Sequence, residues 1–127
     1  MTAAPVLSRI GQISMTARDL DRAVRFYRDT LGLRFLFTAP PQLAFFDCDG
    51  VRLLLDVPVD QEFDHPGSIL YFAVEDIRQA HQTLASRGVT FRQEPHLIAR
   101  LADREVWMAF FDDPEGNTLA LMSEPRL

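Results

Sequence analysis

Short apolar-rich stretches recur along the chain and predict β-strands, and two of them, residues 10–17 and 68–74, alternate apolar and polar residues with the two-residue period of a strand. The predicted strands are residues 10–17, 33–37, 43–48, 51–57, 68–74, 89–92, 106–112 and 117–122. Asp49-Gly50 and Glu115-Gly116 stand between neighbouring predicted strands. Because glycine adopts the left-handed conformations that tight hairpin turns need, both dipeptides predict turns.

Two other segments repeat their apolar residues at helical spacing. These residues are Leu20, Ala23, Val24, Tyr27 and Leu31 in the first segment, and Ile77, Ala80, His81 and Leu84 in the second. Asp19 and Asp76 precede the segments, and we predict that each carboxylate caps a helix by accepting hydrogen bonds from free N–H groups. Gly32 and Gly88 are the predicted C-caps.

The order of these elements occurs twice. The matching residues are Asp19, Leu20 and Ala23 with Asp76, Ile77 and Ala80 at an offset of 57, and Gly50, Leu53 and Leu55 with Gly116, Leu119 and Leu121 at an offset of 66. The repeat predicts an α+β fold in which two βαβββ modules form a single domain. Module one is expected at about residues 8–58 and module two at about 68–124, with a junction at 59–67.

One face of each predicted sheet is apolar, and the other is mixed. Successive side chains point to opposite faces of a strand. The residues expected to pack under the helices are Ile13, Met15, Ala17, Leu53, Leu55, Leu70, Phe72, Val74, Leu119 and Leu121. The opposite face combines polar groups with Leu54, Ile69, Tyr71 and Met122. This mixture favours a concave, partly dry ligand pocket, with a dimer interface or simple core filling as the alternative.

Composition narrows the functional classes. Of the 127 residues, 47% are hydrophobic, which is enough to bury a core and excludes wholesale disorder. The net charge of −5 argues against binding to nucleic-acid phosphates, and the single cysteine excludes an internal disulfide. The sequence shows neither a signal peptide nor an apolar run of the length of a membrane span. We therefore expect a cytoplasmic protein with no nucleic-acid or membrane partner.

Two motifs, together with the repeat, are typical of a known family. The first is Arg18-Asp19-Leu20-Asp21-Arg22-Ala23 with Phe26-Tyr27-Arg28-Asp29 and Leu31-Gly32-Leu33, and the second is Phe111-Asp112-Asp113-Pro114-Glu115-Gly116-Asn117. The chain resembles, over nearly its whole length, the vicinal oxygen chelate superfamily, which includes glyoxalase I, the bleomycin-resistance proteins and the extradiol dioxygenases. The resemblance implies that both modules form a cup-shaped mixed sheet around a ligand, and that the protein is a homodimer.

The resemblance also implies where a divalent metal ion would lie. Members of the superfamily hold it with one residue on the first strand and one on the last strand of each module, and these positions are here Gln12, Leu54, Ile69 and Ala120. The repeat supports this assignment, because its offsets of 57 and 66 pair Gln12 with Ile69 and Leu54 with Ala120. Only Gln12 carries a metal-ligating atom, since aliphatic side chains offer none. We predict a cup without a metal ion or another cofactor.

Nine residues are predicted to bind a ligand. They are Gln12, Ser14, Arg52, Leu54, Ile69, Tyr71, Trp107, Ala120 and Met122. Tyr71 and Trp107 suit stacking on a planar ligand, but the strand of Trp107 is apolar on both faces, so a core position is an equal alternative. Arg52 either binds a ligand carboxylate or pairs with Asp56.

The candidate acid–base residues are His96, Tyr71 and Asp56. His96 is expected after the second strand of module two, in a segment that covers the mouth of the cup, and an ordinary histidine titrates near neutral pH. His65 is interpreted as a loop residue of the junction, and His81 and Cys48 as packing residues.

The leading hypothesis is a metal-independent member of this superfamily that binds a small organic molecule in the cup, for resistance or sequestration. A second hypothesis is a lyase, isomerase or cyclase that uses acid–base residues without the usual metal, with Gln12 as an oxyanion donor. A third is a protein-interaction domain whose sheet is an interface. The sequence leaves open which ligand binds, and whether the modules pair within one chain or across two.

Overall fold

Two βαβββ modules follow one another in the computed structural model, which describes residues 7–59 and 66–127. Module one contains β1 (Gln12–Thr16), α1 (Leu20–Arg25), η1 (Phe26–Thr30), β2 (Arg34–Ala39), β3 (Leu43–Cys48) and β4 (Val51–Asp56). Module two contains β5 (Leu70–Ala73), α2 (Ile77–Ser86), β6 (His96–Arg100), β7 (Glu105–Asp112) and β8 (Thr118–Ser123). The element η1 is a π-helical turn that continues α1. This order confirms the predicted α+β fold.

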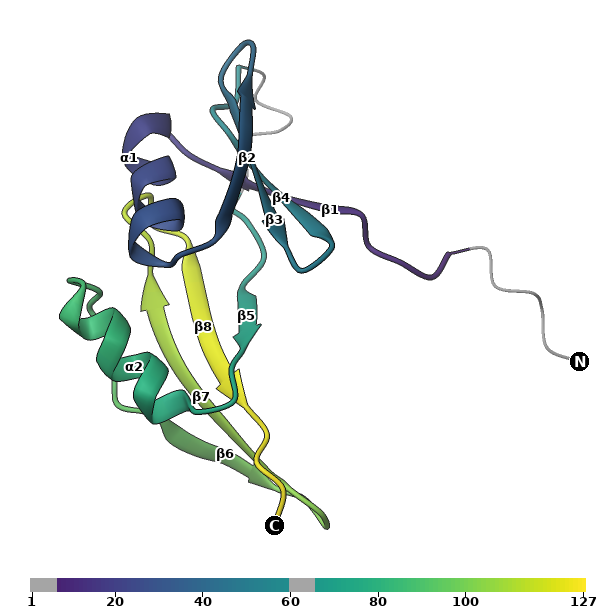
Figure 1. Cartoon of the computed structure of the whole chain (residues 1–127), viewed down its shortest axis with the longest axis vertical. Helices are drawn as coiled ribbons and strands as arrows, with labels where there is room; N and C mark the ends of the chain where they lie inside the picture. The colour runs from purple at the N-terminus through teal and green to yellow at the C-terminus, as the bar shows by residue number, and fades with distance from the viewer. Residues whose placement is uncertain (1–6, 60–65) are drawn as a thin grey trace, which may run out of the picture.

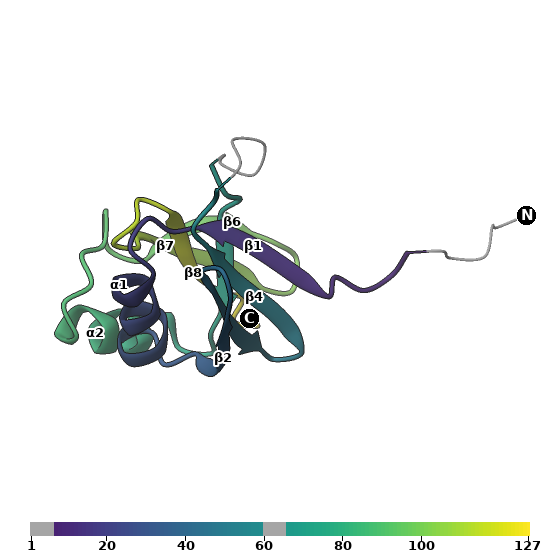
Figure 2. The ribbon, with the colours of Figure 1, turned by 90° about the horizontal axis from the view of Figure 1, so that it is seen from above.

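Each module forms its own four-stranded mixed sheet. The strand order is β1-β4-β3-β2 in sheet one and β5-β8-β7-β6 in sheet two. The first and last strands of a module pair in parallel, and the other neighbours pair antiparallel. Both helices lie on the same side of the molecule (Figures 1 and 2). All ten residues predicted to pack under the helices belong to the hydrophobic core or pack against it.

The middle strands of the two sheets carry the same four residues. Ala44-Phe45-Phe46-Asp47 in β3 matches Ala109-Phe110-Phe111-Asp112 in β7, at an offset of 65. Phe46 and Phe111 are fully buried on the helix side. Phe45 and Phe110 therefore point to the opposite faces of their sheets, since side chains alternate along a strand. The repeat thus extends to the strands that carry the aromatic residues of both sheets.

Both helices begin and end as predicted. An oxygen of Asp19 accepts a hydrogen bond from the backbone N–H of Arg22, and Asp76 accepts one from Gln79, both at 3.1 Å. Gly32 and Gly88 have φ angles of 78° and 94°, which is the left-handed region that a C-cap glycine supplies. Within the described ranges, no helix has the length and apolarity that crossing a membrane requires.

One strand lies elsewhere than predicted. Residues 89–92 contribute only an isolated bridge, between Phe91 and Phe111, and sheet two is completed by β6, which begins at His96. Val89 enters the core directly after α2, and Pro95, which has no N–H to donate to a neighbouring strand, precedes β6. The alternation at 89–92 therefore reflects a loop packed on the core. His96 belongs to the sheet, and the prediction that it lies in a segment over the mouth of the cup is wrong.

A buried polar network joins the two modules at the β7–β8 turn. One carboxylate oxygen of Asp113 accepts hydrogen bonds from the Tyr27 hydroxyl at 2.6 Å and from the Asn117 side-chain amide at 2.8 Å. The other oxygen accepts from the backbone N–H groups of Glu115 and Asn117, each at 2.8 Å. The Asn117 amide also donates to the carbonyl of Thr16 at 3.0 Å. The turn of module two is thereby fixed on β1 and η1 of module one.

Glu115, in the same turn, caps a helix of the other module. Its carboxylate accepts hydrogen bonds from the backbone N–H groups of Arg18 at 3.0 Å and Asp19 at 3.1 Å, and it pairs with the guanidinium of Arg22 at 3.2 Å. The Glu115 side chain is only 2% exposed. It therefore provides, from module two, the acceptors that the start of α1 needs.

Replacing Glu115 by alanine is expected to lower the free energy of unfolding by about 2 kcal/mol, because two backbone donors lose an acceptor whose side chain is 2% exposed. Urea unfolding followed by circular dichroism measures this. Glu115→Gln retains one acceptor oxygen and should lose less. Glu124→Ala, which removes an exposed carboxylate paired with Arg104, is the matched control and should lose far less than Glu115→Ala. Equal losses in Glu115→Ala and Glu124→Ala would contradict the capping role.

Candidate functional site

The face of each sheet that points away from the helices is called here its open face. On sheet one, the register places Gln12, Arg52, Asp47 and Arg34 opposite one another across β1, β4, β3 and β2. Side chains that oppose each other directly on neighbouring strands share a face. These four residues therefore form one polar row, the arginine row, with two guanidinium groups beside a single carboxylate.

An aromatic pair lies next to the arginine row. The rings of Phe45 and Phe37 are 4.7 Å apart, and the guanidinium of Arg52 lies over the Phe45 ring at 5.6 Å from its centroid. Leu54 lies opposite Phe45 on β4, and Ser14 lies opposite Leu54 on β1, so both continue the row of the aromatic pair. Stacking on an aromatic ring favours one orientation of a guanidinium. The contact with Phe45 therefore favours some orientations of the Arg52 guanidinium over others.

The open face of sheet two is largely apolar. Tyr71, Ala120 and Phe110 oppose one another across β5, β8 and β7, and the Tyr71 ring meets the Phe110 ring edge-on at 5.9 Å. Ala120 is fully buried in this row. Tyr71 and Ile69 remain 45% and 44% exposed, so this face presents apolar surface at the β5 edge.

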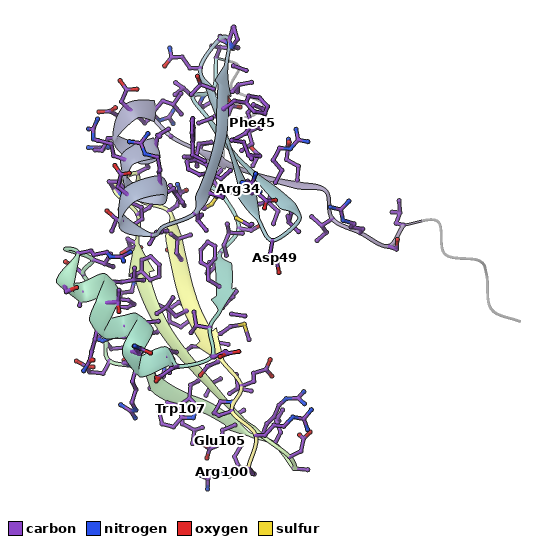
Figure 3. All side chains as sticks on the ribbon, in the orientation of Figure 1. Arg34, Phe45, Asp49, Arg100, Glu105 and Trp107 are labelled. Carbon is purple, nitrogen blue, oxygen red and sulfur yellow. The ribbon has the colours of Figure 1, made fainter. Side chains whose placement is uncertain are left out.

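A cleft of about 690 Å³ lies where the two modules meet. Its polar wall comes from module one and contains Arg34, Asp47, Asp49 and Arg52, and its opposite wall comes from module two and contains Ile69, Tyr71 and Ala73. Ile13, Leu53 and Phe72 add apolar surface. Figure 3 shows Arg34 and Asp49 toward the waist of the molecule, the narrow region where module one meets module two. In Figure 3, Phe45 lies farther from module two. The volume and the mixed lining are typical of a small-molecule site.

The cleft brings together part of the predicted site. Arg52, Ile69 and Tyr71 line it. Gln12, Ser14 and Leu54 lie on the open face of sheet one, and Ala120 and Met122 lie on the open face of sheet two. The predicted residues thus belong to two neighbouring faces that meet at the cleft, and full burial withdraws the Ala120 side chain from any ligand.

Trp107 lies on the other side of sheet two. It shares its face with Ala109 and Phe111, which are fully buried under the helices, and Arg78 of α2 lies over its indole ring at 5.3 Å. Its N–H donates to Glu105 at 3.1 Å, and Figure 3 shows both residues far from the waist. Trp107 therefore takes the core-packing position that the sequence left open as the equal alternative to ligand binding. Because both faces of β7 are apolar, the alternation of residues along the strand does not show to which face the Trp107 side chain points.

The acid–base candidates do not share a site. Asp56 lies four residues from Arg52 on β4, a span of roughly 13 Å, so the two side chains do not pair. His96 lies on β6 and Tyr71 on β5, which are the opposite edges of sheet two. His65 lies outside the described residues. His81 packs as predicted, with its ring 4.3 Å from that of Phe91.

Cys48 lines the cleft but is not activated. Burial raises the pKa of the Cys48 thiol, and the negative charge of Asp47 raises it further. The thiol is therefore protonated at neutral pH and a poor nucleophile. This agrees with its interpretation as a packing residue.

The sequence did not single out as site residues Arg34, Asp47 and Asp49, which line the cleft, or Phe45, which lies beside the arginine row. Arg34, Phe45 and Asp47 join the site because of the register of β2 and β3, and alternation within one strand does not reveal its register against the next. The repeated Ala-Phe-Phe-Asp sequence is the signal that marks β3 and β7 as equivalent, and it would have placed Phe45 and Asp47 on the open face.

A second cavity, of about 490 Å³, lies on the helix side of the interface between the modules. Leu33 and Phe72 line both this cavity and the cleft, and Leu84, Phe111 and Leu121 complete its apolar walls. None of the predicted site residues lines it. We therefore place the candidate site at the cleft, where polar groups from one module face apolar groups from the other.

Comparison with known proteins identifies the family. A sequence model described as Glyoxalase/Bleomycin resistance protein/Dioxygenase superfamily matches residues 9–121. The chain belongs to this superfamily. We call it the glyoxalase superfamily below, and it is the family that the motifs and the repeat resemble. The predicted family is thereby confirmed.

Individual relatives agree over almost the full length. A glyoxylase-like domain-containing protein of Didymella fabae is 29% identical over 131 residues, which is 92% of this chain and 94% of that protein. The crystal structure of a lactoylglutathione lyase from Agrobacterium tumefaciens is 25% identical with a TM-score of 0.73, covering 94% and 96% of the two chains. TnmS3, an antibiotic-binding protein from a Streptomyces species, has a TM-score of 0.76 at 20% identity, covering 96% of this chain and all of that one. This last likeness concerns the fold alone.

The four positions at which the family resemblance implies a metal ion do not carry the donors to hold one here. Gln12 offers a single neutral oxygen, and Leu54, Ile69 and Ala120 offer no donor atom. Over residues 7–59 and 66–127, no group of three or more His, Cys, Asp or Glu side chains is arranged to hold a metal ion. The donor set at these four positions therefore does not support chemistry that runs through a metal ion held there.

Proposed function

We propose that this chain is a metal-independent binding protein of the glyoxalase superfamily that holds a small organic molecule. The observation that carries the proposal is the cleft of about 690 Å³, with guanidinium groups on one wall and an exposed aromatic ring on the other. Small-molecule sites are concave, mostly apolar and equipped with a few fixed polar groups. The cleft has each of these features. Sequestration of a molecule needs nothing more.

The proposal includes a homodimer in which a second copy covers the open faces. Support comes from large apolar side chains at the open faces and their rims: Phe37, Ile69 and Tyr71 are between 44% and 47% exposed. Apolar surface of this kind is typical of an interaction site or a ligand-binding site. A partner copy that covers it would also shield a ligand in the cleft from water.

The protein as purified is expected to contain much less than one divalent metal ion per chain by elemental analysis. Native mass spectrometry of the same sample is expected to show a dimer and any retained organic ligand. The neutral probe 2-naphthamide should bind, and Tyr71→Ala should weaken its binding roughly fivefold, because the loss of an aromatic contact costs on the order of 1 kcal/mol. Titration calorimetry measures both affinities, and Leu101→Ala, at an exposed site outside the cleft, is the control that should retain the affinity.

Three results would contradict this proposal. One divalent ion per chain, removed by a chelator together with binding, would overturn metal independence. A bound compound that is recovered chemically altered would replace the binding protein by an enzyme. The absence of both a retained ligand and probe binding at millimolar concentration would rule out a small-molecule site at the cleft.

A further inference from the structure

The arginine row of module one has a counterpart in module two, in which the charges are balanced by a salt bridge. There Asp112 pairs with Arg92 at 2.6 Å, and Thr118, opposite Asp112 on β8, donates to the same carboxylate at 3.3 Å. The repeat offset of 66 makes Thr118 the counterpart of Arg52. Module two thus has one arginine for one aspartate in this row, whereas module one has Arg34 and Arg52 for Asp47 alone.

The carboxylate in the arginine row is already used. Asp47 accepts a hydrogen bond from the backbone N–H of Gly50 at 3.1 Å, which stabilises the β3–β4 turn. Within residues 7–59 and 66–127, neither Arg34 nor Arg52 forms a salt bridge with it, although both oppose it in the register. Both guanidinium groups therefore keep their N–H donors available on the wall of the cleft.

The other charges at this end of the cleft do not remove the surplus. Asp49 lies at the tip of the β3–β4 turn, and the guanidinium of Arg9 donates to the carbonyl of Gly50 in the same turn. Counting Arg9, three arginines meet two aspartates around the turn. The chain as a whole has a net charge of −5, so a local excess of positive charge stands out against its surroundings.

The opposite wall determines the rest of the ligand. Tyr71 presents a half-exposed ring, Ile69 lies beside it, and Phe72 and Ile13 add apolar surface. A ligand that spans the cleft therefore meets hydrogen-bond donors with positive charge at one end and an aromatic, apolar surface at the other. We infer that the cleft selects organic anions, with a carboxylate bound by Arg52 and Arg34 and an aromatic or apolar body packed against Tyr71.

The orientation of Arg52 makes this selection specific. Its guanidinium lies over the Phe45 ring, 5.6 Å from the centroid, and the Phe45 ring lies 4.7 Å from that of Phe37, so this contact favours some orientations of the guanidinium, and planar guanidinium groups bind carboxylates through two parallel hydrogen bonds. The inference rests on the proposed function and refines it, because it names the chemical class of the molecule that the cleft holds.

The test compares two probes of nearly equal size and shape, 2-naphthoate and neutral 2-naphthamide, by titration calorimetry. Naphthoate is expected to bind at least about tenfold more tightly, and Arg52→Gln should remove this advantage while it leaves naphthamide binding within about twofold. Arg34→Gln should reduce the preference for naphthoate over naphthamide in part. Arg25→Gln, an equal change of charge on an exposed face of α1, is the matched control and should retain it.

The outcomes separate the two proposals. Equal affinity for both probes, or an Arg52→Gln variant that still prefers naphthoate, overturns the anion selection and leaves the binding function intact. Binding of neither probe overturns the anion selection, and if native mass spectrometry also finds no retained ligand, it overturns the binding function. Thermal midpoints of the variants within a few degrees of the parent confirm that a lost affinity is not a lost fold. Raised salt should weaken naphthoate binding alone.

Discussion

Replacing Asp113 by alanine is expected to cost about 3–5 kcal/mol of the free energy of unfolding. The Asp113 carboxylate is 5% exposed and accepts four hydrogen bonds, from Tyr27, Glu115 and twice from Asn117. Alanine leaves all these donors without an acceptor in a place that excludes water, and each such buried group costs about 1–3 kcal/mol. Relaxation of the turn would recover part of this sum, which places the expected loss below the full total. Since small domains have stabilities of about 5–15 kcal/mol, this variant should be near the limit of folding.

The neighbouring aspartate provides the control for this experiment. Asp112→Ala removes a carboxylate of the same kind one residue earlier, but its side chain is 45% exposed, and it pairs with an exposed arginine. Its loss should be far smaller. Asp113→Asn retains the shape of the side chain but replaces one acceptor oxygen by an NH2 group, which faces the donors of the network. Its loss of unfolding free energy should fall between those of Asp112→Ala and Asp113→Ala. Urea unfolding of the three variants decides the matter, and similar losses for Asp112→Ala and Asp113→Ala would show that the network does not hold the modules together.

Elements whose side chains alternate between a buried and a mixed face were predictable from the sequence. In β1, β4 and β8 every inward residue was placed on the helix side, and the caps Asp19 and Asp76 were found at the helix starts. These features depend on neighbours along the chain. The repeat added the module order, because two copies of one pattern must fold into two copies of one unit.

Features that depend on neighbours in space were not predictable in the same way. The strand proposed at 89–92 failed because Val89 and Phe91 are apolar for contact with the core rather than for pairing in a sheet. Trp107 was ambiguous because both faces of β7 are apolar. The arginine row is formed by the register of β2 against β3, which no single segment encodes. The cleft, likewise, exists only because the two sheets stay separate in the described chain.

The two turns that correspond in the repeat lie at different places in the structure. The β7–β8 turn fixes module two to β1 and α1, whereas the corresponding β3–β4 turn of module one borders the cleft. Pseudo-equivalent turns thus have different roles, one closing the interface between the modules and the other leaving it accessible to a ligand. A variant that loosens Asp113 should therefore also alter ligand affinity, by changing the distance between the walls.

Above pH 10 the protein is expected to lose stability at about 1.4 kcal/mol per pH unit, and Tyr27 is the cause. Burial raises the pKa of the Tyr27 hydroxyl far above its ordinary value, and the negative charge of Asp113 and its hydrogen bond raise it further. In the unfolded chain the phenol releases its proton near pH 10, whereas in the folded chain it retains it. The unfolded state then binds fewer protons, so the free energy of unfolding falls as the pH rises and is unaffected by this group at lower pH.

The sequence makes this slope unusually easy to assign. It contains no lysine, since all of its 13 basic residues other than histidine are arginine, so few other side chains titrate near pH 10. Cys48 is one of them, and burial raises the pKa of its thiol in the same direction, so the comparison is made in a Cys48→Ala background. Tyr27→Phe should lower stability by about 1–2 kcal/mol at neutral pH through the lost hydrogen bond and abolish most of the alkaline slope. Tyr71→Phe, which removes a phenol outside the buried network, should keep the slope. Urea unfolding between pH 8 and about pH 12 measures all three proteins, and a slope that persists in Tyr27→Phe would assign the alkaline transition to another group.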